Sequence, residues 1–237
     1  MTSRSGLIPS PNAWRWPGLY ELENRSQDVH GAVARALREV APWDGRDVVD
    51  IGCGAGFHLP MFAATARSVV GVEPHLPLVE QARSRTVDLP TVSVQRGLAQ
   101  QLPMADRSVD VAHARIAYFF GPGCEPGLAE AARVLRPGGV LVVVDLDSSR
   151  SSYGSWMRED LPSYRPSSVE QFFRVQGFSM RRVDTVWQFA DRASLRAVLG
   201  IEFSPGRAER AFAETPGLTV DVAYRVHSRQ KMITTAH

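Results

Sequence analysis

Glycines recur at every second position after a short apolar run that contains an acid. Residues 48–57 read Val-Val-Asp-Ile-Gly-Cys-Gly-Ala-Gly-Phe, so that Gly52, Gly54 and Gly56 follow closely on Asp50. Alternating glycines allow a tight turn from a strand into a helix and let the backbone approach a ligand closely. The helix that follows presents free N–H groups and the positive end of its dipole. This loop is typical of a nucleoside-binding site.

A second acid ends the next apolar run. Residues 69–72 are Val-Val-Gly-Val, and Glu73 follows them directly. An acid at the end of the second strand of such a sheet can accept hydrogen bonds from both ribose hydroxyls. We therefore expect Glu73 to bind a ribose at the carboxyl ends of the strands, where the strand order reverses.

The glycine spacing distinguishes two classes of cofactor. The dinucleotide fingerprint is G-x-G-x-x-G, whereas this loop reads G-x-G-x-G and has Phe57 where the third fingerprint glycine would fall. Asp50 would also repel a pyrophosphate. A cofactor with a cationic amino group and no phosphate would accept that acid, so the spacing argues against a nicotinamide dinucleotide.

Strands and helices alternate through the region that must position these residues. Short continuous apolar runs that alternate with helical segments predict a parallel sheet covered on both faces. Two later strands are joined by a helical insertion, and the last strand is expected to be antiparallel. The predicted strands are residues 48–51, 69–72, 92–95, 109–114, 140–146, 178–189 and 220–227, and the predicted helices are 57–65, 76–86, 126–135, 192–199 and 207–214.

The flanking segments give weaker patterns. Residues 1–25 contain several prolines and tryptophans and are predicted to be irregular. Ser26 is predicted to cap a helix that runs to about residue 40, and Ser168 a helix that Gly177 ends. Residues 148–155 are polar and are predicted to form a loop.

Composition limits the class of protein. The 237 residues are 44% hydrophobic and 22% charged, as expected of a globular α/β domain. The net charge is +2 and the arginines are scattered among 25 acids, so no nucleic-acid partner is expected, because phosphate recognition needs clustered charge. Cys53 and Cys124 form no disulfide or metal-ligand pattern, and no apolar run approaches the roughly 20 residues of a membrane span. We expect a cytoplasmic protein with neither a metal nor a membrane partner.

Four segments in the same order make the sequence resemble the class I S-adenosylmethionine-dependent methyltransferases, and within them the type 11 small-molecule branch. They are residues 48–57, 70–74, 102–110 and 133–139, within a similarity that covers about 26–147. The resemblance implies a Rossmann-like α/β fold: a seven-stranded, mostly parallel sheet with helices on both faces. It also implies S-adenosylmethionine as the cofactor. We expect one domain, with a cap at 1–45, a cofactor-binding core at 46–147 and the C-terminal strands with their insertion at 148–237.

The resemblance also assigns roles by position. Pro74 and His75 would flank the adenine, and Leu98 and Ala99 occupy its edge. Many members have an acid where this chain has Leu98, so the adenine edge would be bound by backbone, by Gln100 or by water. The positions assigned to the methionine and ribose moieties are Asp50, Gly52, Gly54, Gly56, Glu73, Ala114 and Arg115.

Methyl transfer from a sulfonium is an in-line displacement, so positioning can supply much of the catalysis. A base is required only when the nucleophile must lose a proton. The candidate catalytic residues are His113, for which a place in the core is the alternative, and Tyr118, which could line an acceptor pocket or only pack. Trp14, Trp16 and Tyr20 could form a lid or merely anchor the N-terminal segment. The insertion around Glu202 could shape acceptor specificity.

The resulting hypothesis is methyl transfer from S-adenosylmethionine to an oxygen or nitrogen nucleophile of a small molecule, by a monomer or homodimer. One alternative is a protein that binds S-adenosylmethionine without methylating, as a structural cofactor or in a cyclisation or rearrangement. A nicotinamide-dependent oxidoreductase and a nucleic-acid methyltransferase are further alternatives, which the loop spacing and the dispersed charge respectively disfavour.

Overall fold

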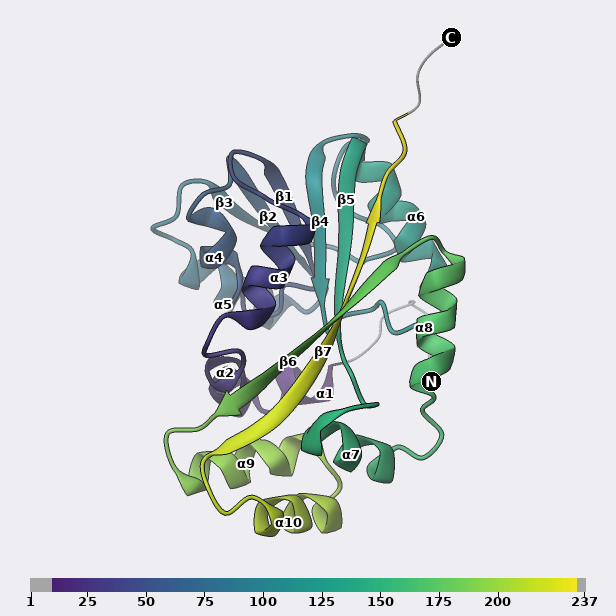
Figure 1. The fold of residues 1–237 in the computed structure, drawn as a ribbon. Helices are drawn as coiled ribbons and strands as arrows, with labels where there is room; N and C mark the ends of the chain where they lie inside the picture. The colour runs from purple at the N-terminus through teal and green to yellow at the C-terminus, as the bar shows by residue number, and fades with distance from the viewer. Residues whose placement is uncertain (1–9, 234–237) are drawn as a thin grey trace.

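A seven-stranded sheet forms the centre of the computed structural model, which describes residues 10–233. Its strand order is β3-β2-β1-β4-β5-β7-β6, and β7 alone runs antiparallel to its neighbours, as predicted (Figure 1). The strands are β1 (Asp47–Ile51), β2 (Ser68–Glu73), β3 (Val92–Arg96), β4 (Val109–Arg115), β5 (Leu135–Leu146), β6 (Ser179–Gln188) and β7 (Thr219–Gln230).

Helices cover both faces of this sheet. Val142 and Val144 of β5 pack in one core with α3 (Ala32–Val40), α4 (Leu59–Ala63) and α5 (Leu76–Arg85). The alternate residues Leu141 and Val143 face a second core with α6 (Glu125–Val134) and α8 (Pro166–Val175). Successive side chains of a strand point to opposite faces, so a strand buried on both sides must be apolar throughout. The predicted α/β class is confirmed.

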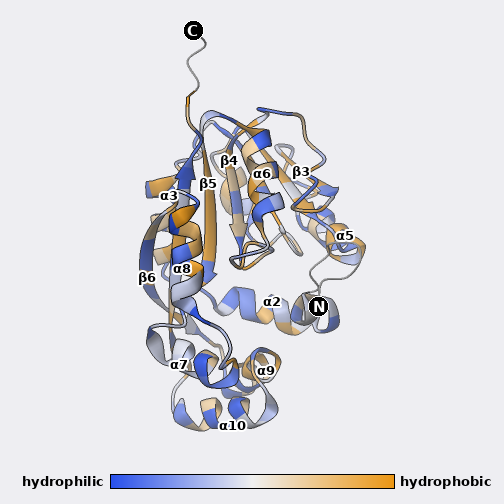
Figure 2. Cartoon of the chain, turned by 90° about the vertical axis from the view of Figure 1, so that its right-hand side faces the viewer, coloured by the Kyte–Doolittle hydropathy of each residue, from blue (hydrophilic) through white to orange (hydrophobic). Residues whose placement is uncertain are grey.

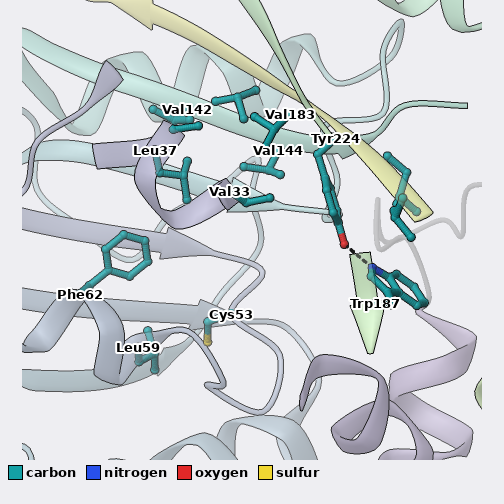
Figure 3. Packing of buried hydrophobic residues seen from close by; sticks show 14 of the residues in the cluster. Val33, Leu37, Cys53, Leu59, Phe62, Val142, Val144, Val183, Trp187 and Tyr224 are labelled. Carbon is teal, nitrogen blue, oxygen red and sulfur yellow. Dashed lines mark hydrogen bonds between the residues drawn. The ribbon is translucent and has the colours of Figure 1, made fainter. Parts of the chain in front are cut away.

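The sheet is more polar at its β6 edge than at its centre. Figure 2 shows β5 as almost wholly hydrophobic and β6, the outermost strand, as largely hydrophilic. Inside this edge, Trp187 Nε1 of β6 donates a hydrogen bond of 2.8 Å to the Tyr224 hydroxyl of β7 (Figure 3). A buried indole N–H and a buried phenol each need a polar partner, and this pair provides both.

Five helices gather beyond the carboxyl ends of the parallel strands (Figure 1). They are α1 (Pro11–Arg15), α2 (Pro17–Ser26), α7 (Ser151–Asp160), α9 (Arg192–Glu202) and α10 (Pro205–Glu214). Among residues 10–233, no helix is long and apolar enough to cross a membrane.

Two of the sequence predictions for these segments are wrong. Residues 11–15 and 17–26 are helical rather than irregular, because Pro11 and Pro17 occupy first helical turns, where a missing N–H costs nothing. The predicted loop at 148–155 contains the start of α7, because Tyr153 and Trp156 are buried and their packing outweighs weak helix propensity. Residues 1–9 lie outside the described part of the chain.

The predicted ends of three elements are also wrong. Ser26 ends α2 instead of capping α3, and Asp28 satisfies the free N–H groups of α3 by accepting from Val33 N and Ala34 N at 2.9–3.1 Å. Ser168 lies inside α8, which begins two residues earlier. β5 starts before residue 140 and includes the 136–139 turn, where its register against β4 shifts.

The cap on α3 gives a first prediction. Asp28→Ala should lower the free energy of unfolding by about 1 kcal/mol, because two backbone N–H groups lose their acceptor. Ser26→Ala should have a smaller effect, since the Ser26 hydroxyl only donates to Leu22 O within its own helix. Urea denaturation of both variants measures the difference, and equal losses would contradict this role for Asp28.

Candidate active site

The glycine loop is held against the end of β2 by its backbone. Gly52 N and Cys53 N both donate to Val72 O, at 2.8 and 3.1 Å. Gly52 has a φ of +75°, and a Cβ there would lie 2.5 Å from Ala117 Cβ. Only glycine allows this backbone conformation beside the segment that follows β4.

The Glu73 side chain fastens the same loop from the other side. Its Oε2 accepts from Gly54 N at 3.1 Å, and its Oε1 accepts from His75 N at 2.9 Å. The residue is 5% exposed, and burial raises the pKa of its carboxyl group. Each oxygen still has a lone pair for a further donor, so the carboxyl group can receive two hydroxyls of a ligand.

A cavity of ≈ 240 Å³ opens beside Glu73. Pro74, Leu98 and Ala99 line it, and the Trp14 ring stacks on His75 with a centroid distance of 4.5 Å. These flat and apolar surfaces suit an aromatic base, and the Glu73 carboxyl group lines the same cavity. The residues predicted for adenine and ribose therefore meet in one place.

A second cavity, of ≈ 160 Å³, adjoins the first, and Gly52 and Tyr20 line both. It is the more polar of the two. The predicted methionine-site residues Asp50 and Arg115 line it. Gly56 lines neither cavity, and a Cβ at this position would lie 3.0 Å from Ala82 Cβ of α5. Glu23, His58 and Glu202 are further ionisable residues of the second cavity's lining, with Tyr20 and Cys53.

Arg115 has an unused donor at this second cavity. Its Nη2 donates to Gln27 Oε1 at 2.8 Å, and its guanidinium lies over the Tyr224 ring, 4.9 Å from the centroid. Its Nε is buried and has no hydrogen-bond partner among residues 10–233. A guanidinium in this state can bind a carboxylate.

His113 lies in the core beneath the site. It is 1% exposed and lines neither cavity, and its Nδ1 is 2.7 Å from Asp50 Oδ1. This placement agrees with the interpretation of His113 as a core residue that orients Asp50 and does not touch a substrate. Since both partners are on neighbouring strands, the contact also ties β1 to β4.

Tyr118 lines the first cavity, and its ring lies on Gly127 of α6, where a Cβ would come within 2.4 Å of it. Burial raises its pKa, which makes the hydroxyl a poor base. Of the proposed lid aromatics, Trp14 and Tyr20 line this cavity, whereas Trp16 is 53% exposed and does not.

Sequence reasoning missed Glu23. It lies on α2, is 5% exposed, and interacts with Glu202 of α9 across the second cavity. The available signal in the sequence was the spacing of four residues between Glu23 and Gln27, which lets the two side chains meet on one face of a helix. The Gln27 amide donates to Glu23 Oε1 at 2.8 Å. No group of His, Cys, Asp or Glu among the described residues could bind a metal ion.

Comparison with known proteins identifies the family. A family model described as a methyltransferase domain matches residues 49–143. A protein of Mycolicibacterium smegmatis named "Probable S-adenosylmethionine-dependent methyltransferase" is 30% identical over 218 residues, which are 87% of this chain and 80% of that protein. The chain belongs to the S-adenosylmethionine-dependent methyltransferases. It is therefore an enzyme of that family, and S-adenosylmethionine is its cofactor.

Other similar proteins match less of their own length or share only the fold. An uncharacterized protein of a Streptomyces fradiae transposon is 40% identical over 106 residues, 44% of this chain, and the match spans 31% of that protein. The YcgJ protein of Bacillus subtilis superposes with a TM-score of 0.61 at 19% identity, over 86% of this chain and 99% of that one. The cyclase SpnF superposes with a TM-score of 0.60 at 20% identity, over 88% and 84%.

The buried Glu23 carboxyl group predicts a pH-dependent stability. Burial first, and then Glu202, raise its pKa well above 4.5, so the native state retains a proton that the unfolded chain loses above that pH. The contribution of this group to stability must therefore fall as the pH rises above about 4.5. Glu23→Gln removes this titration and should become progressively more stable relative to the wild type as the pH rises.

Thermal unfolding at a series of pH values measures this difference. Glu209→Gln is a matched control, because Glu209 is exposed on α10 and pairs with Arg196. A pH-independent difference between Glu23→Gln and the wild type would contradict the raised pKa.

Proposed function

We propose that this methyltransferase transfers the methyl group to an oxygen or nitrogen nucleophile of a small molecule. The observation that carries the proposal is the pair of adjoining cavities, one with an apolar wall beside Glu73 and one polar, which share Gly52 and Tyr20. Together they offer an enclosed site that suits a cofactor and a compact acceptor.

The residues present fit the cofactor. Glu73 would hold the ribose hydroxyls, and Arg115, whose Nε is unpartnered, would bind the methionine carboxylate. Asp50, oriented by His113, would face the methionine ammonium. When bound, S-adenosylmethionine supplies an electrophilic methyl group on sulfur. The protein's contribution is to orient both reactants and exclude water around them.

A small acceptor is favoured by what surrounds the site. Trp14 and Tyr20 from the N-terminal helices lie over the first cavity, and Ile116 and Phe120 form an apolar rim beside it. Such walls match a compact ligand of mixed polarity. Many of the arginines pair with acids, including Arg67 with Asp47, which leaves less unpaired positive charge for a nucleic-acid backbone.

A second candidate is a protein that binds the cofactor without methylating, in a cyclisation or rearrangement. The cyclase SpnF shares the fold, and within the described residues neither His113 nor Tyr118 is placed as an obvious base. Formation of S-adenosylhomocysteine in the presence of candidate acceptors supports methyl transfer. Turnover of a substrate with the cofactor unconsumed would support the alternative.

The ribose role gives a direct test. Glu73→Ala should weaken binding of S-adenosylhomocysteine by at least about tenfold, because the ribose loses a charged acceptor and Gly54 N loses its partner. Glu73→Gln should lie between this variant and the wild type. Isothermal titration calorimetry measures the affinities, and Glu80→Ala on the exposed side of α5 is the matched control.

Circular dichroism shows whether each variant is folded. Unchanged affinity in a folded Glu73→Ala protein would contradict the assignment.

A further inference from the structure

Two carboxyl groups from distant parts of the chain meet in the second cavity. Glu23 is contributed by α2 and Glu202 by the last turn of α9, and these helices pack on each other. Both are remote in sequence from the glycine loop. They therefore form an acidic wall that the family's nucleotide-binding segments do not contribute.

The hydrogen bonds of the pair leave one oxygen without an N–H donor. Glu202 accepts from Asn12 Nδ2 at 2.5 Å and from the Tyr153 hydroxyl. Glu23 Oε1 accepts from Gln27 Nε2, and the Glu23 carboxyl group also contacts that of Glu202. The buried Glu23 Oε2 has no N–H donor among residues 10–233. A buried carboxyl oxygen without an N–H donor costs free energy, which a bound cation can recover.

The pair also lacks a salt-bridge partner. Two adjacent buried carboxyl groups resist ionising together, so the pair retains a proton. Burial and Glu202 raise the pKa of Glu23, while the nearby Arg115 opposes that shift, and burial raises the pKa of Glu202. Arg115 contacts Gln27 and Tyr224 and forms no ion pair with either glutamate among the described residues. The pair can therefore take a cation as its ion-pair partner.

A methionine moiety has a single ammonium group, and Asp50 beside the glycine loop suits it. The glutamate pair then remains for a second cation. The acceptor is the other molecule that the site must bind, and a neutral alcohol would gain little from a charged receptor. A protonated amine would gain both a charge partner and a donor for Glu23 Oε2.

We propose that Glu23 and Glu202 together bind the methyl acceptor, and that this acceptor is a compact primary or secondary amine. The proposal rests on the methyl-transfer function proposed above and narrows it from oxygen or nitrogen to nitrogen. Tyr153 and Asn12 are positioning residues, because they hold the Glu202 carboxyl group in place.

The transfer step balances with the pair as proton acceptor. The amine enters as an ammonium ion and gives one proton to the ionised carboxylate, which frees the nitrogen lone pair. The nitrogen then forms a bond to the methyl carbon while the sulfur–carbon bond breaks, and its electron pair stays on sulfur. The methylated product leaves as an ammonium ion, and the pair returns its extra proton to solvent.

Calorimetric titration of the protein saturated with S-adenosylhomocysteine tests the proposal without turnover. The probes are matched amines and alcohols of equal skeleton, from 2-phenylethylamine and 2-phenylethanol to small aliphatic and bicyclic aromatic pairs. At least one amine should bind about tenfold more tightly than its alcohol. The double variant Glu23→Gln/Glu202→Gln should abolish that preference, because each single variant leaves one carboxyl group that can ionise, whereas Glu209→Gln should retain it.

The affinity for S-adenosylhomocysteine itself should change little in the double variant. A marked loss there would show that the pair binds the cofactor's ammonium group and would overturn the proposal. Equal binding of amines and alcohols, an unchanged preference in the double variant, or failure of every amine to bind would also overturn it.

The proposed function is tested separately. Wild-type protein that forms S-adenosylhomocysteine with alcohols or phenols but not amines would leave methyl transfer intact and remove this inference alone. Wild-type protein that consumes the cofactor with no nucleophile at all would contradict methyl transfer.

Discussion

The site depends on one carboxyl group that organises two loops at once. Glu73 accepts from Gly54 N on the first loop and from His75 N on its own loop, so a single side chain sets the distance between the turns after β1 and β2. Both hydrogen bonds are made to a buried carboxyl group, and hydrogen bonds to a carboxylate are stronger than ordinary backbone hydrogen bonds. The proposed ribose position is therefore prepared before any ligand arrives, at the wall of the first cavity.

A second organising contact lies at the second cavity, around the side-chain amide of Gln27. Gln27 donates to Glu23, and its carbonyl oxygen accepts from Arg115 Nη2 and from the Tyr224 hydroxyl. One amide thus connects α2 with β4 and β7, and Tyr224 extends the network to Trp187 in the core (Figure 3). Helix α2 is held at the carboxyl edge of the sheet, and its acid is held in the cavity.

The cofactor half of the site was accessible from sequence because its requirements are local. The turn at Gly52 requires a positive φ, which glycine adopts readily, and Glu73 lies at the end of the next strand. Residue type and spacing in the sequence are therefore enough to propose both residues for the site. The errors fall where long-range packing decides. Segment 151–160 is polar in sequence but helical because Tyr153 and Trp156 find partners in α9 and α10. The sequence left His113 open between a catalytic and a core position, and only the fold places it in the core beside Asp50 of β1.

The sequence by itself determined the strand and glycine pattern, the family and the donor cofactor, because each follows from local backbone conformation and periodic burial. Only the tertiary structure decided which residues line the second cavity. Glu23 and Glu202 are 179 positions apart in a chain of 237 residues, and no spacing rule relates them. Their meeting depends on α2 and α9 packing together beyond the sheet, and the charge of the cavity follows from that packing.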